Sequence, residues 1–237
     1  MSMIEYLIDV IIYFTFYSFI GWCLETVFAS VNKRKFINRG FLYGPFCPIY
    51  GFGALLIIFS EELLRNVVKP ESLSVTLKIL VAILLTTTLE YITGFILEKI
   101  FNRKWWDYSN NFLNLHGRIC LTYSILWGIL AYILINVIHP FSEKYIGSAS
   151  ITLKLSFAVI IIIYFIIDTI KSVTEILDLK EILKIYYKNP LESFWDKNIK
   201  NRRIIKAFPG LDQLNISKIN KKEVMNFTHG KFKKRQK

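Results

Sequence analysis

The sequence is poor in the residues that form metal sites and disulfides. It contains only three cysteines and three histidines among 237 residues. Neither Cys-x-x-Cys nor His-Glu-x-x-His occurs, and zinc sites commonly use such spacings. We therefore expect no metal ion, no cofactor and no disulfide framework. The cysteines lie in or beside apolar stretches and are expected to be buried: Cys23, Cys47 and Cys120.

Motifs of ATP-driven and hydrolytic enzymes are also missing. The sequence has no Gly-x-x-x-x-Gly-Lys-Ser/Thr loop for the phosphates of ATP and no Gly-x-Ser-x-Gly nucleophile turn. We therefore expect no ATPase within this chain. The sequence favours a protein that is not an enzyme, and it indicates no catalytic residue. Residues 1–5 contain no Lys or Arg, so a cleaved signal peptide is not expected either.

Apolar residues, in contrast, are abundant and gathered in long blocks. They make up 53% of the chain, aromatic residues make up 16%, and the mean hydropathy is +0.39. A helix of about 20 apolar residues crosses the roughly 30 Å hydrocarbon core of a bilayer. The sequence therefore predicts an all-α integral membrane protein with about five transmembrane helices, at residues 6–31, 45–59, 77–97, 119–138 and 151–170.

The positive charges of the loops predict the orientation of these spans. Lys and Arg crowd the first loop, with Lys33, Arg34, Lys35 and Arg39, and the third loop, with Lys99, Arg103, Lys104 and Arg118. The second and fourth loops have fewer. Because positive loops stay in the cytoplasm, we expect an outside N-terminus and a cytoplasmic C-terminus in a bacterial inner membrane. The transmembrane domain would comprise residues 1–171 and the cytoplasmic tail residues 172–237.

The predicted tail is basic and amphipathic. From Lys171 onward, 17 Lys and Arg residues stand against 7 Asp and Glu residues, which accounts for most of the formal net charge of +12. Such a tail is attracted to the anionic lipids of the inner leaflet, so we do not expect nucleic acid as a partner. Two helices with one apolar face are predicted, one ending at Asn189-Pro190 and one over residues 191–208. They contact either the membrane surface, a partner, or the protein's own cytoplasmic loops.

Two glutamates inside the predicted spans are candidates for a polar site. An ionisable side chain at this depth costs about 2.5–3.5 kcal/mol on insertion scales, so it needs a partner or a role. Glu90 stands between two apolar runs of the third span, and Glu25 lies in the inner half of the first. The alternative for Glu90 is a structural ion pair with Arg39 or Arg118. Two aspartates nearer the span ends are expected to be hydrated: Asp9 and Asp168.

Glycines and prolines interrupt the helical pattern before the second span. They are Gly40, Gly44, Pro45, Pro48, Gly51 and Gly53. Broken backbone at membrane depth is tolerated only where protein buries it or where it lines a cavity. We therefore predict a broken or re-entrant start to the second span, whose backbone amides together with Arg39 would favour an anionic group. The alternative is close helix packing through the glycines with a proline-started helix.

The third loop carries further candidates. Trp105 and Trp106 fit an interfacial aromatic belt. His116 could move a proton with Asp107 or Glu90 as its partner, although a lone histidine before a helix is more often a hydrogen-bonding cap.

Three stretches resemble one bacterial membrane protein family. They are residues 16–25, with the sequence FYSFIGWCLE, residues 38–53, which include GPFCPIYG, and Trp106-Asp107-Tyr108-Ser109 with Gly117-Arg118-Ile119-Cys120. The resemblance covers about residues 6–171 and is to the family described as "Putative ABC-transporter type IV". It implies a membrane subunit that works with a separate ATPase. It supplies no catalytic residues, so the polar-site candidates depend on the physical argument alone: Glu25, Arg39, Glu90, Asp107, His116 and Arg118.

We therefore expect the multi-pass membrane subunit of an ABC-type transport system, with Glu25 and Glu90 lining a polar site reached past Arg39 and Arg118. Two alternatives stay open. One is an intramembrane enzyme acting on lipid-linked phosphates, with Glu90 or His116 as the base. The other is a structural or regulatory membrane scaffold. The expected partners are the lipid bilayer, a separate ATPase and a second copy in a homo-oligomer.

Overall fold

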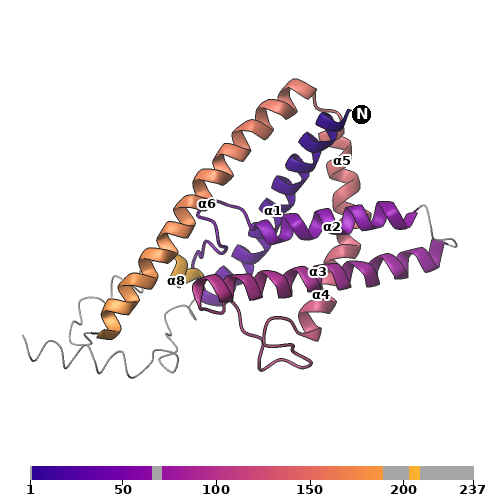
Figure 1. The fold of residues 1–237 in the computed structure, drawn as a ribbon. Coiled ribbons are helices and arrows are strands. Elements are labelled where there is room, and N and C mark those ends of the chain that lie inside the picture. Colours follow the sequence, from indigo (N-terminus) through magenta and orange to yellow (C-terminus); the bar gives the residue numbers. More distant parts are fainter. Residues whose placement is uncertain (1, 66–70, 189–202, 209–237) are drawn as a thin grey trace, which may run out of the picture.

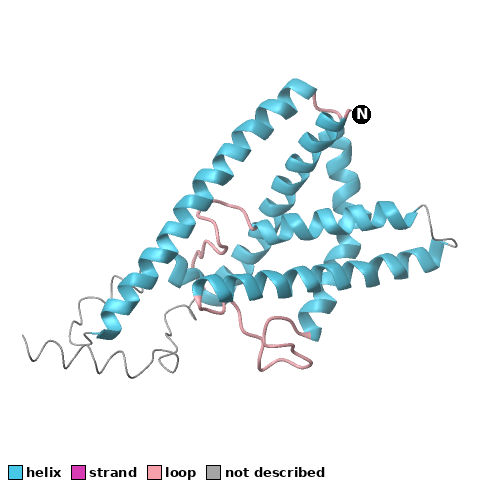
Figure 2. Ribbon diagram, viewed as in Figure 1, coloured by secondary structure: helices cyan, strands magenta, loops and turns pink. Residues whose placement is uncertain are grey.

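The described part of the chain is all-helical. The structure is a computed structural model that describes residues 2–65, 71–188 and 203–208, and these contain no strand (Figures 1 and 2). The helices are α1 (Met3–Lys33), α2 (Pro48–Arg65), α3 (Glu71–Phe101), α4 (Leu121–Ile133), the π-helical turn η1 (Leu134–Ile138), α5 (His139–Gly147), α6 (Ile151–Lys188) and α8 (Arg203–Ala207).

Four helical segments are long and apolar enough to cross a membrane. They are α1, α3, the continuous run of α4, η1 and α5, and α6. The expected second span corresponds to α2, which is not among the four and whose last turns carry Glu61, Glu62 and Arg65. Many large apolar side chains on these helices are exposed, as expected of surfaces that face lipid rather than water.

Local sequence explains where several helices begin and bend. Ser2 and Glu5 form a capping box at the start of α1, and Arg34 ends that helix in the left-handed conformation. Pro140 lies in the first turn of α5, where it lacks an N–H and crowds the carbonyl four residues earlier. The π-helical turn η1 precedes it, so one long helix is locally widened at this point.

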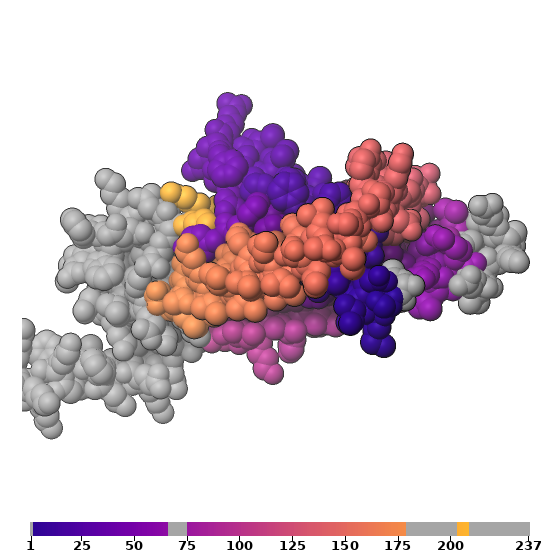
Figure 3. Space-filling model, turned by 90° about the horizontal axis from the view of Figure 1, so that it is seen from above, coloured from indigo at the N-terminus to yellow at the C-terminus, as the bar shows by residue number. Residues whose placement is uncertain are grey.

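The helices pack in chain order around one apolar core. α2 packs against α1 and α3, and α3 packs against α4, and Figure 1 shows α2 and α3 side by side. The core residues come from all of these helices: Tyr17, Ala54, Ile57, Ala82, Ala131 and Leu134. α6 packs mainly against α1 and lies across the face seen in Figure 3.

A second, separate apolar cluster lies where α3 ends. It joins α3, the following loop, α6 and α8 through Phe101, Trp105, Ile176, Ile204 and Ile205. The tail segment in α8 therefore packs on the protein's own loops, one of the alternatives that the sequence allowed.

The predicted fifth span and the first predicted amphipathic segment form one continuous helix. This helix, α6, runs from Ile151 to Lys188 and ends directly before the predicted stop at Asn189-Pro190. The second predicted amphipathic segment, residues 191–208, lies outside the described residues except for 203–208, where α8 forms. The predicted irregular backbone before the second span is present, since residues 34–47 contain no helix.

Gly51 gives a test of the packing between α1 and α2. A Cβ atom at Gly51 would lie 2.7 Å from the carbonyl oxygen of Phe14 and would clash with the Ser18 hydroxyl. Gly51→Ala should therefore destabilise the protein by about 1–3 kcal/mol, the usual cost of overpacking, as measured by thermal unfolding in detergent. The control is Gly53→Ala, because a Cβ atom at Gly53 would lie 3.6 Å or more from its neighbours. Equal stability of the two variants would contradict this packing.

Candidate functional site

The irregular segment 34–47 is held by side chains from other parts of the chain. Gly40 adopts a φ of +136°, which side-chain-bearing residues rarely adopt. Trp22 on α1 donates its indole N–H to Asn38 Oδ1 at 2.7 Å, and Asn38 Nδ2 donates to the Tyr43 carbonyl at 2.7 Å. Each of these bonds fixes backbone that no helix stabilises.

Asp168 binds this segment rather than water, so the expectation that it is hydrated is wrong. Its carboxylate oxygens accept the backbone N–H groups of Tyr43 and Gly44, both at 2.9 Å. Asp168 is only 6% exposed. These two part-buried amides lie outside any helix and need an acceptor, and α6 supplies one carboxylate for both. Asp9 likewise is paired, with Lys154 on α6 at 2.9 Å.

Of the remaining predicted backbone positions, Gly44 and Pro45 lie in the same segment, whereas Pro48, Gly51 and Gly53 lie in α2. The amide of Phe46 donates to the Gly44 carbonyl at 2.9 Å, which closes a tight turn around Pro45. Pro48 is the first residue of α2, as a proline-started helix requires.

Glu25 lies beside this segment and is paired. The Tyr50 hydroxyl, from the first turn of α2, donates to Glu25 Oε1 at 2.8 Å. Arg39 Nε lies 3.4 Å from Glu25 Oε2, and both side chains are about one-third exposed or less. The first glutamate is therefore balanced by a cation and a hydroxyl.

Glu90 is buried among uncharged donors. The Tyr108 hydroxyl donates to Glu90 Oε1 and the Trp127 indole N–H donates to Oε2, both at 3.2 Å. Glu90 is 6% exposed, and no Lys or Arg in the described chain lies within ion-pair distance of it. The alternative that Glu90 pairs with Arg39 or Arg118 is therefore wrong, because both arginines pair with other glutamates.

An aromatic contact joins the two glutamates. The Tyr50 ring lies against the Trp127 ring, with centroids 5.2 Å apart. Tyr50 binds Glu25 and Trp127 binds Glu90, so the two acids are linked across α2 and α4. We call this group the two-glutamate site: Glu25, Arg39, Tyr50, Glu90, Tyr108 and Trp127.

Arg118 belongs to a different group. Its Nη2 lies 2.9 Å from Glu98 Oε2, and its guanidinium lies 5.3 Å from the ring centroids of both Tyr91 and Phe95. His116 Nδ1 lies 3.1 Å from the Tyr91 hydroxyl. Arg118 and His116 therefore tie the third loop to α3 and do not contact Glu90.

Asp107 stabilises a turn within the third loop. It accepts hydrogen bonds from the backbone N–H and hydroxyl of Ser109, and it pairs with Lys104 at 3.3 Å. Its partial burial would raise its pKa, but these donors outweigh burial and hold the pKa below its usual value. None of these bonds joins Asp107 to His116 or Glu90.

One comparison with known proteins decides the family. The model of the family described as "Putative ABC-transporter type IV" matches residues 12–173. The chain belongs to this family. The searches of curated proteins and of solved structures gave no significant match. The type IV match contains every residue of the two-glutamate site, whereas α8 lies beyond its end.

Sequence reasoning does not identify three side chains of this site: Tyr50, Tyr108 and Trp127. Tyr108 lies in the third loop, whose aromatic residues fit an interfacial belt, and Tyr50 and Trp127 lie within predicted spans, where aromatic residues are not conspicuous. The signal that could have found them is chemical: a buried Tyr or Trp usually finds a partner for its O–H or N–H, and the buried glutamates need donors.

A second polar cluster lies on α1 and α5. The Ser142 hydroxyl donates to the His139 carbonyl at 2.9 Å, so it accepts the Tyr17 hydroxyl proton at 2.8 Å. Tyr17 must then accept from His139 Nδ1, also at 2.8 Å. This chain of bonds fixes the imidazole tautomer. Among the described residues, no group of His, Cys, Asp or Glu side chains could hold a metal ion.

The different partners of the two glutamates predict different effects on stability. Glu25→Gln removes the charge opposite Arg39 and should cost about 1 kcal/mol. Glu90→Gln should leave stability unchanged, because the amide oxygen can accept from Trp127 and the amide nitrogen can donate to Tyr108. Thermal unfolding of both variants in the same detergent measures this difference. A larger loss for Glu90→Gln than for Glu25→Gln would contradict the assignment of partners.

Proposed function

We propose that the chain is the membrane subunit of an ABC-type transport system whose ATPase is a separate protein. Membership of the type IV family and four helices apolar enough to span a membrane support a transport role in a membrane. The two-glutamate site supports the further step, because it places polar chemistry inside the bundle. A subunit of this kind would recognise its solute or a coupling ion there.

The observation that carries this proposal is the environment of Glu90. A carboxylate inside a membrane helix is costly unless it is paired, yet its partners here are a phenol and an indole, both neutral. Such a group gains stability when a proton or a cationic solute reaches it. Glu25, held by Arg39, would form the cytoplasmic side of the same path.

The proposed topology has five spans, with α2 as the second. This arrangement puts the basic first and third loops and the tail in the cytoplasm and the N-terminus outside. It also brings Lys and Arg of the tail to the anionic leaflet of a bacterial inner membrane.

The enzyme alternative has less support. A lipid-linked phosphate would need free cations, but Arg39 is engaged with Glu25 and Arg118 with Glu98. The scaffold alternative assigns no role to the buried carboxylate of Glu90, so we prefer the transport function.

Copurification tests the proposed partner. The tagged protein, purified from its native host in mild detergent, should carry a stoichiometric ATPase that mass spectrometry identifies. Glu90→Gln should lower the solute-stimulated ATP hydrolysis of this complex at least tenfold. The matched control is Glu62→Gln, an exposed acid at the end of α2. A homo-oligomer without an ATPase, or full activity of the Glu90→Gln complex, would refute the proposal.

Cysteine labelling tests the proposed topology. In a variant whose native cysteines are serine, a single cysteine replaces either exposed Ser148, between α5 and α6, or exposed Lys35, after α1. A membrane-impermeant maleimide added to intact cells should label Ser148→Cys and leave Lys35→Cys unlabelled until the cells are opened. Labelling of both, or the reverse pattern, would contradict the orientation.

A further inference from the structure

The short helix α8 is held in a groove on the membrane domain. Ile204 and Ala207 are 0% exposed, although α8 has only five residues. An isolated helix of that length does not form in water, so its conformation depends on the groove. The groove walls are apolar side chains from the first and third loops, α3 and α6: Phe41, Leu97, Phe101, Trp105, Trp106 and Ile176.

Two arginines bind the groove and the segment to each other reciprocally. Arg203 of the tail donates to the carbonyls of Gly40 and Phe41, at 3.1 and 3.0 Å. Arg39 of the first loop donates to the Ala207 carbonyl at 3.0 Å and lies 4.9 Å from the Phe208 ring centroid. None of these carbonyls has a partner within a helix. Those of Gly40 and Phe41 lie in the irregular segment, and that of Ala207 lies at the end of α8. The groove therefore recognises two features of the tail: the backbone conformation that presents the Ala207 carbonyl, and an arginine at position 203.

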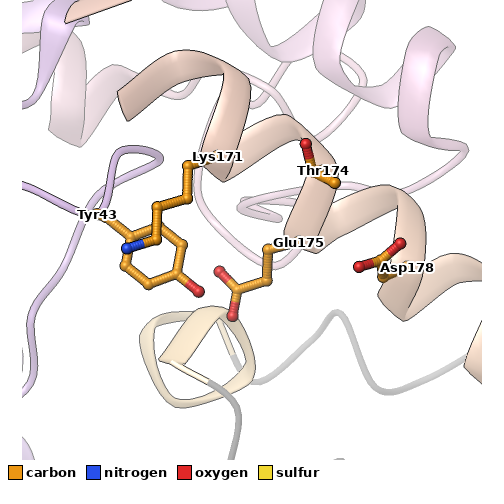
Figure 4. A pocket seen from close by; sticks show the side chains of 5 residues that line it. All are labelled: Tyr43, Lys171, Thr174, Glu175 and Asp178. Atoms are coloured by element: carbon orange, nitrogen blue, oxygen red, sulfur yellow. The ribbon is translucent and has the colours of Figure 1, made fainter. Parts of the chain in front are cut away.

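Side chains of α6 complete the arginine site. Arg203 lies over the Tyr43 ring at 4.5 Å and 3.8 Å from Glu175 Oε2. Figure 4 shows Tyr43 and Glu175 close together beside α8, and the Lys171 ammonium lies over the Tyr43 ring, 4.4 Å from its centroid. Burial lowers the pKa of Arg203, which the nearby Glu175 opposes. The guanidinium is thus enclosed by an aromatic face, a carboxylate and two carbonyls.

The groove is coupled to the two-glutamate site through one residue. Arg39 contacts Glu25 through Nε and the tail segment through Nη1. The apolar cluster around α8 is separate from the core of the helix bundle, so the segment can leave without removing a core residue. The segment also lies outside the family match, whereas Arg39, Gly40, Phe41 and Trp105 lie inside it.

From these contacts we infer that the cytoplasmic groove is a peptide-binding site, and that residues 203–208 of the same chain are its ligand and close the Glu25–Arg39 end of the two-glutamate site. Departure of the segment frees Arg39 from the Ala207 carbonyl and opens this end. The inference goes beyond the transport proposal and does not require an ATPase partner.

Native Cys47 reports on the occupancy of the groove. It is buried, and its thiol lies 3.7 Å from the Arg39 carbonyl. Loss of the segment loosens residues 39–43 and exposes this thiol. In the purified full chain, Arg203→Ala should raise the rate of Cys47 alkylation at least tenfold, measured by mass spectrometry of the modified peptide. The matched control is Lys206→Ala, an exposed position on the same short helix, which should leave the rate unchanged.

A rescue experiment keeps the test independent of folding defects. A chain ending at residue 202 should alkylate Cys47 as fast as Arg203→Ala, and a free peptide of residues 203–208 should restore protection. The same peptide with alanine in place of Arg203 should not. Unchanged alkylation in Arg203→Ala and in the shortened chain would overturn the inference. Protection that falls on dilution of the full chain would place the segment in a second copy and overturn its assignment to the same chain.

Discussion

The structure depends on satisfying the backbone of the irregular segment between α1 and α2. This segment follows a helix that ends at Arg34 and contains a glycine in a conformation that other residues avoid. Because the segment is not helical, it lacks the regular hydrogen bonds that a helix makes within itself, and buried backbone groups without partners are costly. Asp168 takes two of the amides, and Arg203 takes two of the carbonyls. The positions of α6 and α8 relative to α1 and α2 follow from these bonds.

The two glutamates illustrate two ways to keep a carboxylate in a helix bundle. Glu25 is opposite a cation and keeps some contact with the surface. Glu90 has neutral donors only among the described residues, which stabilise its charge less than a cation would. The contact between Tyr50 and Trp127 places these two environments next to each other. The Glu25 end of the site is therefore stabilised by an ion pair, whereas Glu90 in the interior can respond to a proton or a cation.

Hydropathy and the cost of charge in a membrane predicted much of this arrangement. The apolar blocks became helices, and Glu25 and Glu90 were identified because an acid in an apolar run is conspicuous. Their partners could not be predicted, since partners depend on how each helix is rotated about its axis and on the path of the loops. Arg118 illustrates this limit, because it binds Glu98 on the adjacent helix end rather than Glu90. Asp168 was misjudged for the same reason: its two amide partners lie more than 120 residues earlier in the chain.

The π-helical turn before Pro140 sets which side of the helix the residues after it face. Each residue of an α-helix turns the chain by about 100°, and a π-helical turn accommodates one residue more than an α-helical turn does. The bonds of Tyr17 to His139 and Ser142 need those two side chains to face α1. Loss of one residue from 134–138 would rotate everything after it away from that face while leaving the apolar character of the helix intact. Homologues that keep these bonds should therefore have the same number of residues between α4 and α5, even where other side chains along this helix differ.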